Sequence, residues 1–76
     1  MKEKDQKRMQ EFGVQLKKLR MEQGLSIREL ALRCDVDYGK ISKLENNKVN
    51  VNLTTLFEIA EGLNVHPTKL LDFDFE

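Results

Sequence analysis

Three polar side chains close together in the chain have the chemistry needed to contact the bases of double-stranded DNA. They are Tyr38, Ser42 and Lys43. Lysine donates hydrogen bonds to O6 and N7 of guanine, serine contacts several bases, and tyrosine packs on a thymine methyl group or reaches a phosphate. The three side chains can act together only where one surface presents all of them, so their use depends on the elements that position them.

Residues 37–46 have the pattern of a short helix with one apolar face. Asp37 is a favourable N-cap residue, and Ile41 and Leu44 share one face at about 100° per residue. Glycine is a poor helix former, but at Gly39 it allows close approach of the backbone to a ligand. The outward face and its flanks carry small and polar residues: Tyr38, Gly39, Lys40, Ser42, Lys43 and Asn46.

A second short helix is predicted immediately before this one. Ser26 and Glu29 have the spacing of a capping box, and Leu25 and Leu30 sit where a hydrophobic staple would join. Residues 25–47 are therefore predicted to form two short helices across a tight turn, which is the pattern of a DNA-binding helix-turn-helix. We expect five apolar residues to hold the two helices together: Leu30, Ala31, Val36, Ile41 and Leu44.

Helical periodicity continues along the rest of the chain. The spacing of apolar residues predicts helices over residues 6–23 and 53–63. Pro67 opens a short fifth helix that carries Leu70 and Leu71. Left-handed backbone is expected where helices end, at residues that tolerate it: Gly24, Asp35, Asn47 and Asn64.

Length and composition indicate a single small domain. No alternating strand pattern precedes the last few residues, so we assign residues 1–76 to one all-α domain of five helices, in which residues 1–9 can fray. A chain of this length buries only about 60–65% of its unfolded surface, so an oligomeric partner would add stability. The chain has one cysteine, no apolar run that could span a membrane and no signal-peptide pattern. These features predict a cytoplasmic protein.

Charge is unevenly distributed along the chain, although the net charge is zero. Residues 17–48 carry eight basic and five acidic side chains, whereas residues 49–76 carry one basic and five acidic side chains. Because phosphate binding needs a basic surface, we expect the first of these segments to face DNA. The acidic segment would be repelled by DNA and would favour one orientation.

Residues on either side of the predicted reading helix are suited to phosphate oxygens. Arg28 lies near the start of the preceding helix, where free backbone N–H groups also favour an anion. A polar segment follows the reading helix: Asn46, Asn47, Lys48 and Asn50. The alternative is that Lys40, Lys43 and Lys48 form an ordinary solvated face. The agreement of two helices, their caps and the turn favours DNA binding.

Four stretches of the chain match a known pattern. They are Leu-Lys-Lys-Leu-Arg at 16–20, Gly-Leu-Ser-x-x-Glu-Leu-Ala at 24–31, Ile-Ser-Lys-Leu-Glu at 41–45 and Leu-x-x-Ile-Ala-x-x-Leu at 56–63. Together they make the chain resemble the Xre family, the phage-repressor and Cro type of helix-turn-helix, over about residues 10–71. In its five-helix size the chain resembles the small controller proteins of restriction–modification systems and compact phage-type repressors.

The resemblance implies roles for individual residues. Arg20 and Glu45 would form an ion pair that joins the first helix to the third. The chain departs from the family at two positions, because Ile27 replaces a glutamine that touches the DNA backbone and Gly39 leaves a base-reading position without a side chain. Base contacts would come from Tyr38, Ser42 and Lys43, and phosphate contacts from Lys40, Asn46 and the loop around Lys48.

The remaining candidate residues predict no enzyme, cofactor or metal site. Cys34 ends the predicted second helix, where a small buried residue fits, with redox sensing as the alternative. His66 has no Cys or His cluster near it in the sequence. Glu58 and Glu61 share a helix face without a nucleophile, which indicates a solvated face.

The tail at residues 72–76 combines aromatic and acidic side chains. Either Phe73 and Phe75 fold back onto their own domain, or they join Leu70 and Leu71 in a two-fold dimer interface. We favour the dimer, because single small modules bind DNA weakly and paired half-sites raise affinity.

Two functions remain open from the sequence. The first is a transcriptional regulator that binds a pseudo-palindromic operator as a homodimer. The alternative is an antitoxin-type or other protein-interaction module that holds a protein partner with Phe73 and Phe75.

Overall fold

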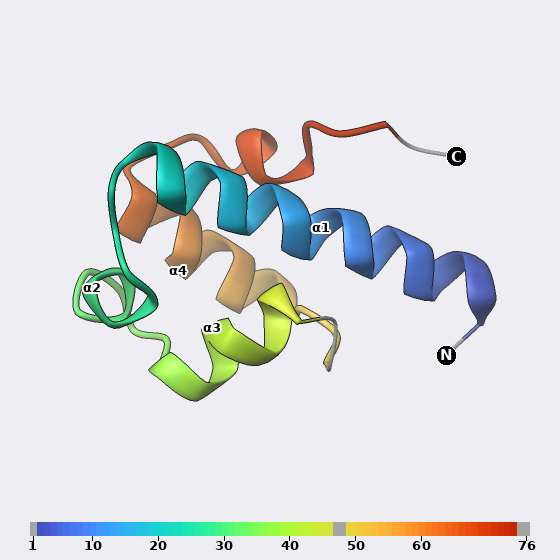
Figure 1. Ribbon diagram of the computed structural model, residues 1–76, viewed down its shortest axis with the longest axis horizontal. Helices are drawn as coiled ribbons and strands as arrows, with labels where there is room; N and C mark the ends of the chain where they lie inside the picture. The colour runs from blue at the N-terminus through green and yellow to red at the C-terminus, as the bar shows by residue number, and fades with distance from the viewer. Residues whose placement is uncertain (1, 47–48, 75–76) are drawn as a thin grey trace.

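The computed structural model describes residues 2–46 and 49–74 of the chain. Within these residues the chain forms four α-helices and one short 3-10 helix, and no strand (Figure 1). The predicted all-α class is therefore confirmed. The elements follow in the order α1 (Glu3–Glu22), α2 (Ile27–Ala31), α3 (Tyr38–Glu45), α4 (Leu53–Leu63) and η1 (Pro67–Leu71).

The prediction of a fifth α-helix is wrong, because this segment forms the 3-10 helix η1. Its Lys69 N–H donates to the carbonyl of His66 over 2.9 Å. Five residues make little more than one turn, and such short segments commonly close with i→i+3 hydrogen bonds. Pro67 does open the element, as predicted. The tight turn buries Leu70 completely and leaves Leu71 about half exposed, at 53%.

α1 extends along nearly the whole length of the molecule. Its 20 residues span about 30 Å at the usual helical rise, and the longest dimension of the domain is 32 Å. α1 packs against α3 and η1, which lie on opposite sides of it (Figure 1). α2 packs against α3 and α4. These contacts surround one core of twelve buried residues: Phe12, Leu16, Leu25, Leu30, Val36, Ile41, Leu44, Leu56, Ile59, Ala60, Leu63 and Leu70.

Two glutamine side chains, one within α1 and one at its C-cap, bind carbonyl groups on other elements. Gln23 Nε2 donates to the carbonyl of Leu63, the last residue of α4, over 2.6 Å. Gln15 Nε2 donates to the carbonyl of Lys69 in η1 over 2.7 Å. Since carbonyls at helix ends lack partners within their own helix, the Gln23 bond satisfies the Leu63 carbonyl. The Lys69 carbonyl also accepts the Asp72 N–H over 3.4 Å. The two glutamine bonds join the α1 segment to α4 and to η1.

The helices α2, α3 and α4 each begin with a side-chain cap. The capping box of α2 is confirmed, because the Glu29 N–H donates to Ser26 Oγ over 3.0 Å and the Ser26 N–H donates to Glu29 Oε1 over 2.8 Å. Asp37 and Asn52 each accept from a backbone N–H three residues later, at the starts of α3 and α4. The predicted helix starts around the helix-turn-helix are therefore correct.

Two of the predicted left-handed residues are confirmed. Gly24 has φ +70° and Asn64 has φ +55°. The prediction for Asp35 is wrong, because its φ is not positive. The turn instead binds to α4, where Glu58 Oε1 accepts from the Asp35 N–H over 3.0 Å. The prediction for Asn47 lies outside the described residues.

Close packing of α2 on α4 depends on a glycine. A Cβ atom at Gly62 would lie 3.0 Å from both Cys34 Cβ and Leu30 Cδ1, so no larger residue fits there without a shift of its neighbours. Cys34 is half-buried against the core, and its Sγ donates to the Leu30 carbonyl over 3.4 Å. Burial raises the pKa of the Cys34 thiol above its ordinary value. These contacts support the packing interpretation of this cysteine.

The capping box makes stability depend on pH. The hydrogen bond from the Ser26 N–H, followed by the bond with the Ser26 hydroxyl, lowers the pKa of Glu29 below its ordinary value. A lowered pKa in the folded state contributes stability above the unfolded pKa, and this contribution is lost as the pH falls through the folded pKa. Glu29→Gln keeps a capping side chain that does not titrate. We therefore expect the wild-type protein to lose stability relative to Glu29→Gln between about pH 5 and pH 2.

Urea unfolding of both proteins across this pH range measures the difference. Glu61→Gln, at an exposed position on α4, is the matched control. The free energies of unfolding of wild type and Glu29→Gln are compared after the effect of the control is subtracted. If their difference stays constant over this pH range, the role of the capping box is contradicted.

Candidate nucleic-acid interface

The outward face of α3 presents the side chains predicted to contact DNA bases. Ile41 and Leu44 on its inward face are buried. On the outward face Lys43 is exposed, Tyr38 is 44% exposed and Ser42 is half-buried. A shallow depression of about 280 Å³ lies beside them and is lined by Asp37, Gly39, Lys40, Lys43 and Val49. Gly39 lines this depression, and a Cβ atom at that position would lie 3.2 Å from Asp37 Oδ2.

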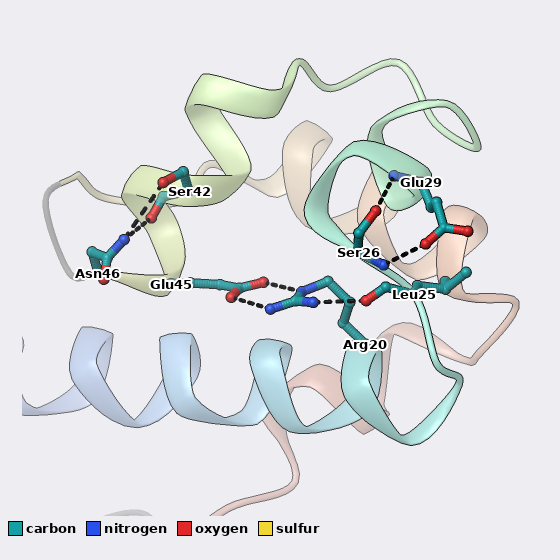
Figure 2. Close-up of polar contacts among 7 residues, drawn as sticks. All are labelled: Arg20, Leu25, Ser26, Glu29, Ser42, Glu45 and Asn46. Atoms are coloured by element: carbon teal, nitrogen blue, oxygen red, sulfur yellow. Dashed lines mark hydrogen bonds and ion pairs between the residues drawn. The ribbon is translucent and has the colours of Figure 1, made fainter.

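Two of the predicted DNA contacts bind each other. Asn46 Nδ2 donates to the Ser42 carbonyl over 2.8 Å and approaches Ser42 Oγ at 3.5 Å (Figure 2). The Ser42 carbonyl also accepts the backbone N–H of Asn46 over 3.0 Å, so the main chain and the side chain of Asn46 both bind the last turn of α3. Asn46 and Ser42 form one polar unit at this end of the reading face.

A cation–π contact joins the two helices of the motif. The guanidinium carbon of Arg28, on α2, lies 4.8 Å from the centre of the Tyr38 ring, at the start of α3. At the start of α2 the capping box already occupies the N–H groups of Ser26 and Glu29. Part of the donor set that the sequence suggested for a phosphate is therefore in use within the protein.

A buried ion pair holds α3 against α1. Arg20 Nε and Nη2 donate to the two carboxylate oxygens of Glu45 over 2.7 and 2.9 Å (Figure 2). The third bond runs from Arg20 Nη1 to the carbonyl of Leu25 over 2.7 Å. The two side chains are only 10% and 4% exposed, and the hydrogen bond with Glu45 raises the pKa of Arg20. The pair implied by the family resemblance is present in the structure.

Glu58 has a role that sequence reasoning missed. The sequence predicts a solvated face for it, but Glu58 is half-buried and its carboxylate accepts the Asp35 N–H in the turn between α2 and α3. The two residues are 23 positions apart, so no local pattern indicates the bond. Only the packing of α4 beside the turn brings them together.

The family model for helix-turn-helix proteins designated HTH_3 matches residues 16–70. This range includes α2, α3, α4 and both residues of the buried ion pair. The chain belongs to the HTH_3 family.

Relatives of this HTH_3 chain include controllers of restriction–modification systems. It is 42% identical over 60 residues to the control protein C.MunI of a Mycoplasma species, over 78% of this chain and 81% of the relative. The structure of the restriction–modification controller C.AhdI of Aeromonas hydrophila aligns with a TM-score of 0.79 at 31% identity, covering 82% of this chain and 94% of the other. The controller C.Esp1396I, solved as a tetramer with its natural 35-base-pair operator, aligns with a TM-score of 0.78 at 28% identity over 84% of each chain.

The burial of residues in this HTH_3 domain shows that part of the predicted dimer interface is wrong. Leu70 is fully buried in the core of its own chain, so it cannot contribute surface to a second copy. Leu71 is exposed, and Phe73 is half-buried and packs against the core. Phe75 lies outside the described residues. For Phe73, the interpretation that it folds back onto its own domain is the better description.

Four further sequence interpretations can be compared with the structure. Ile27 is partly buried against the core, which explains an apolar residue at a position where the family carries glutamine. The predicted phosphate contacts Asn47 and Lys48 lie outside the described residues. Among residues 2–46 and 49–74, no group of three or more His, Cys, Asp or Glu side chains could hold a metal ion. No helix in this part of the chain is long and apolar enough to cross a membrane.

The buried ion pair predicts a large effect of removing one charge. Glu45→Gln leaves the Arg20 guanidinium buried without a counter-charge, and we expect a loss of about 3 kcal/mol in the free energy of unfolding. Equilibrium urea unfolding measures it. The double variant Arg20→Met/Glu45→Leu removes both charges and should regain part of the loss. A Glu45→Gln protein as stable as wild type would show that the pair does not hold α3.

Proposed function

We propose that the protein is a sequence-specific DNA-binding regulator of transcription that acts as a homodimer on a pseudo-palindromic operator. The observation that carries this proposal is the outward face of α3. It combines Tyr38, Ser42 and Lys43 with the bare backbone of Gly39, while the apolar face of α3 is buried. A helix of this kind, held by a preceding helix across a tight turn, fits the major groove.

Membership of a helix-turn-helix family supports the proposal. The operator complex described for C.Esp1396I supports operator DNA as the ligand class. The likeness to control proteins on sequence and on structure favours a controller role over other regulator types. The activity required is binding, and the residues singled out above supply groups for binding and not for covalent chemistry.

The exposure of residues on α3 supports the proposed roles of individual residues. Lys43 is exposed on the reading face and would donate to guanine, while Tyr38 and Ser42 would contact neighbouring bases. Phosphate oxygens would be bound at the edges of this face, where they set register and orientation. The proposed phosphate contacts at these edges are Lys40 and Asn46, and the sequence pattern alone adds Asn47 and Lys48.

The surface around η1 is the proposed dimer interface. Leu71 is exposed there, beside an almost wholly apolar groove of about 270 Å³ lined by the Arg8 side chain, Met9, Phe12, Val51, Leu71 and Phe73. η1 lies on the opposite side of α1 from α3 (Figure 1). Dimerisation through η1 would therefore leave the reading face open to DNA.

The antitoxin-type alternative receives less support. It requires an aromatic tail that is available to a protein partner, but Phe73 packs against the core of its own chain. We therefore retain the DNA-binding regulator as the function that the site supports.

Fluorescence anisotropy on a duplex from upstream of the protein's own gene tests the proposal, with a scrambled duplex beside it at low and moderate salt. We expect tight, salt-sensitive binding that prefers the upstream duplex. Lys43→Ala should weaken binding to the preferred duplex by about 1–3 kcal/mol and should relax the preference. Lys4→Ala, at an exposed position near the start of α1 and outside both proposed surfaces, should change neither. No binding even at low salt would overturn the proposal.

Analytical ultracentrifugation over a range of protein concentrations tests the dimer. Leu71→Glu would place a charge in the apolar interface, and we expect it to shift the equilibrium to monomer at concentrations where the wild type is dimeric. Leu32→Glu, at a leucine that is 87% exposed, is the matched control and should leave the dimer intact. A Leu71→Glu protein with unchanged association would place the interface elsewhere.

A further inference from the structure

The contact between Arg28 and Tyr38 joins an exposed cation to the first residue of the reading helix. The guanidinium lies over the ring, with its carbon 4.8 Å from the ring centre. Residues near the N-terminus of a recognition helix are the ones that reach base edges. Tyr38 occupies the first position of α3, directly after the N-cap Asp37. The orientation of its ring therefore bears on which base the helix can accept.

Neighbouring acidic groups are already engaged with the backbone. Glu29, next to Arg28, binds the Ser26 N–H, and Asp37, next to Tyr38, binds the Lys40 N–H. The aromatic face of Tyr38 is therefore the electron-rich surface on which the structure places the Arg28 guanidinium. The cation covers one face of the ring, and Tyr38 as a whole remains 44% exposed for contact with DNA.

We propose that Arg28 is a positioning residue for Tyr38: its guanidinium, lying over the ring, holds that ring in the orientation that discriminates between bases. The sequence alone suggested that Arg28 binds a phosphate. A phosphate contact contributes equally on every DNA sequence, whereas a residue that orients Tyr38 contributes mainly on the preferred one. This inference rests on the proposed function, because it assigns a specificity role within the same reading face.

Arg28→Lys separates the two roles. Lysine keeps the positive charge and satisfies a phosphate, but it lacks the planar group that stacks on an aromatic ring. We expect Arg28→Lys to lower the ratio of affinities for the upstream and scrambled duplexes by about threefold, while affinity for the scrambled duplex and its salt dependence stay unchanged. In a Tyr38→Ala background the same substitution should have no further effect on the ratio.

Arg33→Lys is the matched control, because Arg33 is an exposed arginine in the turn that follows α2. It should leave the ratio of affinities unchanged. An equal effect of Arg28→Lys on both duplexes, or the same fall in the ratio with and without the Tyr38 ring, would overturn the inference and return Arg28 to a phosphate role.

A measurement on the free protein keeps the inference separate from the proposed function. Tyr38 is the only tyrosine of the chain, which has no tryptophan. Protons of the Arg28 side chain that lie over the ring should show upfield ring-current shifts by NMR, and Tyr38→Ala should abolish them. Unchanged Arg28 shifts in Tyr38→Ala would overturn the inference. A wild-type protein that shows these shifts but does not distinguish the two duplexes would contradict the proposed function instead.

Discussion

The buried ion pair between Arg20 and Glu45 is the interaction on which the rest of the structure depends. Arg20, on α1, donates two hydrogen bonds to Glu45, the last residue of α3. It donates a third to the carbonyl of Leu25, just before α2. One side chain thus connects the long helix to both elements of the helix-turn-helix (Figure 2). Because a buried charge is tolerated only when it is paired and hydrogen-bonded, this geometry permits little displacement of α3.

The remaining tertiary contacts constrain the same motif from the other side. Glu58 on α4 binds the turn at Asp35, and Gly62 allows α2 to pack closely on α4 through Leu30 and Cys34. The recognition face is therefore supported from both α1 and α4 while its own side chains remain at the surface. A small DNA-binding domain needs supporting residues as well as exposed contact residues, because groups that contact bases must be oriented by residues that do not.

Local signals in the sequence were enough to predict the elements around the site. A capping box is complete within four residues, and an N-cap such as Asp37 acts on an N–H three residues away, so both can be recognised without knowledge of the fold. The inward direction of Ile41 and Leu44 follows from helical periodicity alone. The family resemblance added the pair of Arg20 and Glu45, which are 25 positions apart.

The sequence by itself thus determined the helical class, the helix starts around the turn and the side chains that α3 turns outward, because each depends on interactions over a few neighbouring residues. Tertiary packing decided the rest. The bond from Asp35 to Glu58, the full burial of Leu70 and the placement of Arg28 over Tyr38 each depend on residues that meet only after the helices have packed. Such contacts produce no periodic pattern in the sequence, because the number of residues between the two partners is set by how the helices are arranged in space.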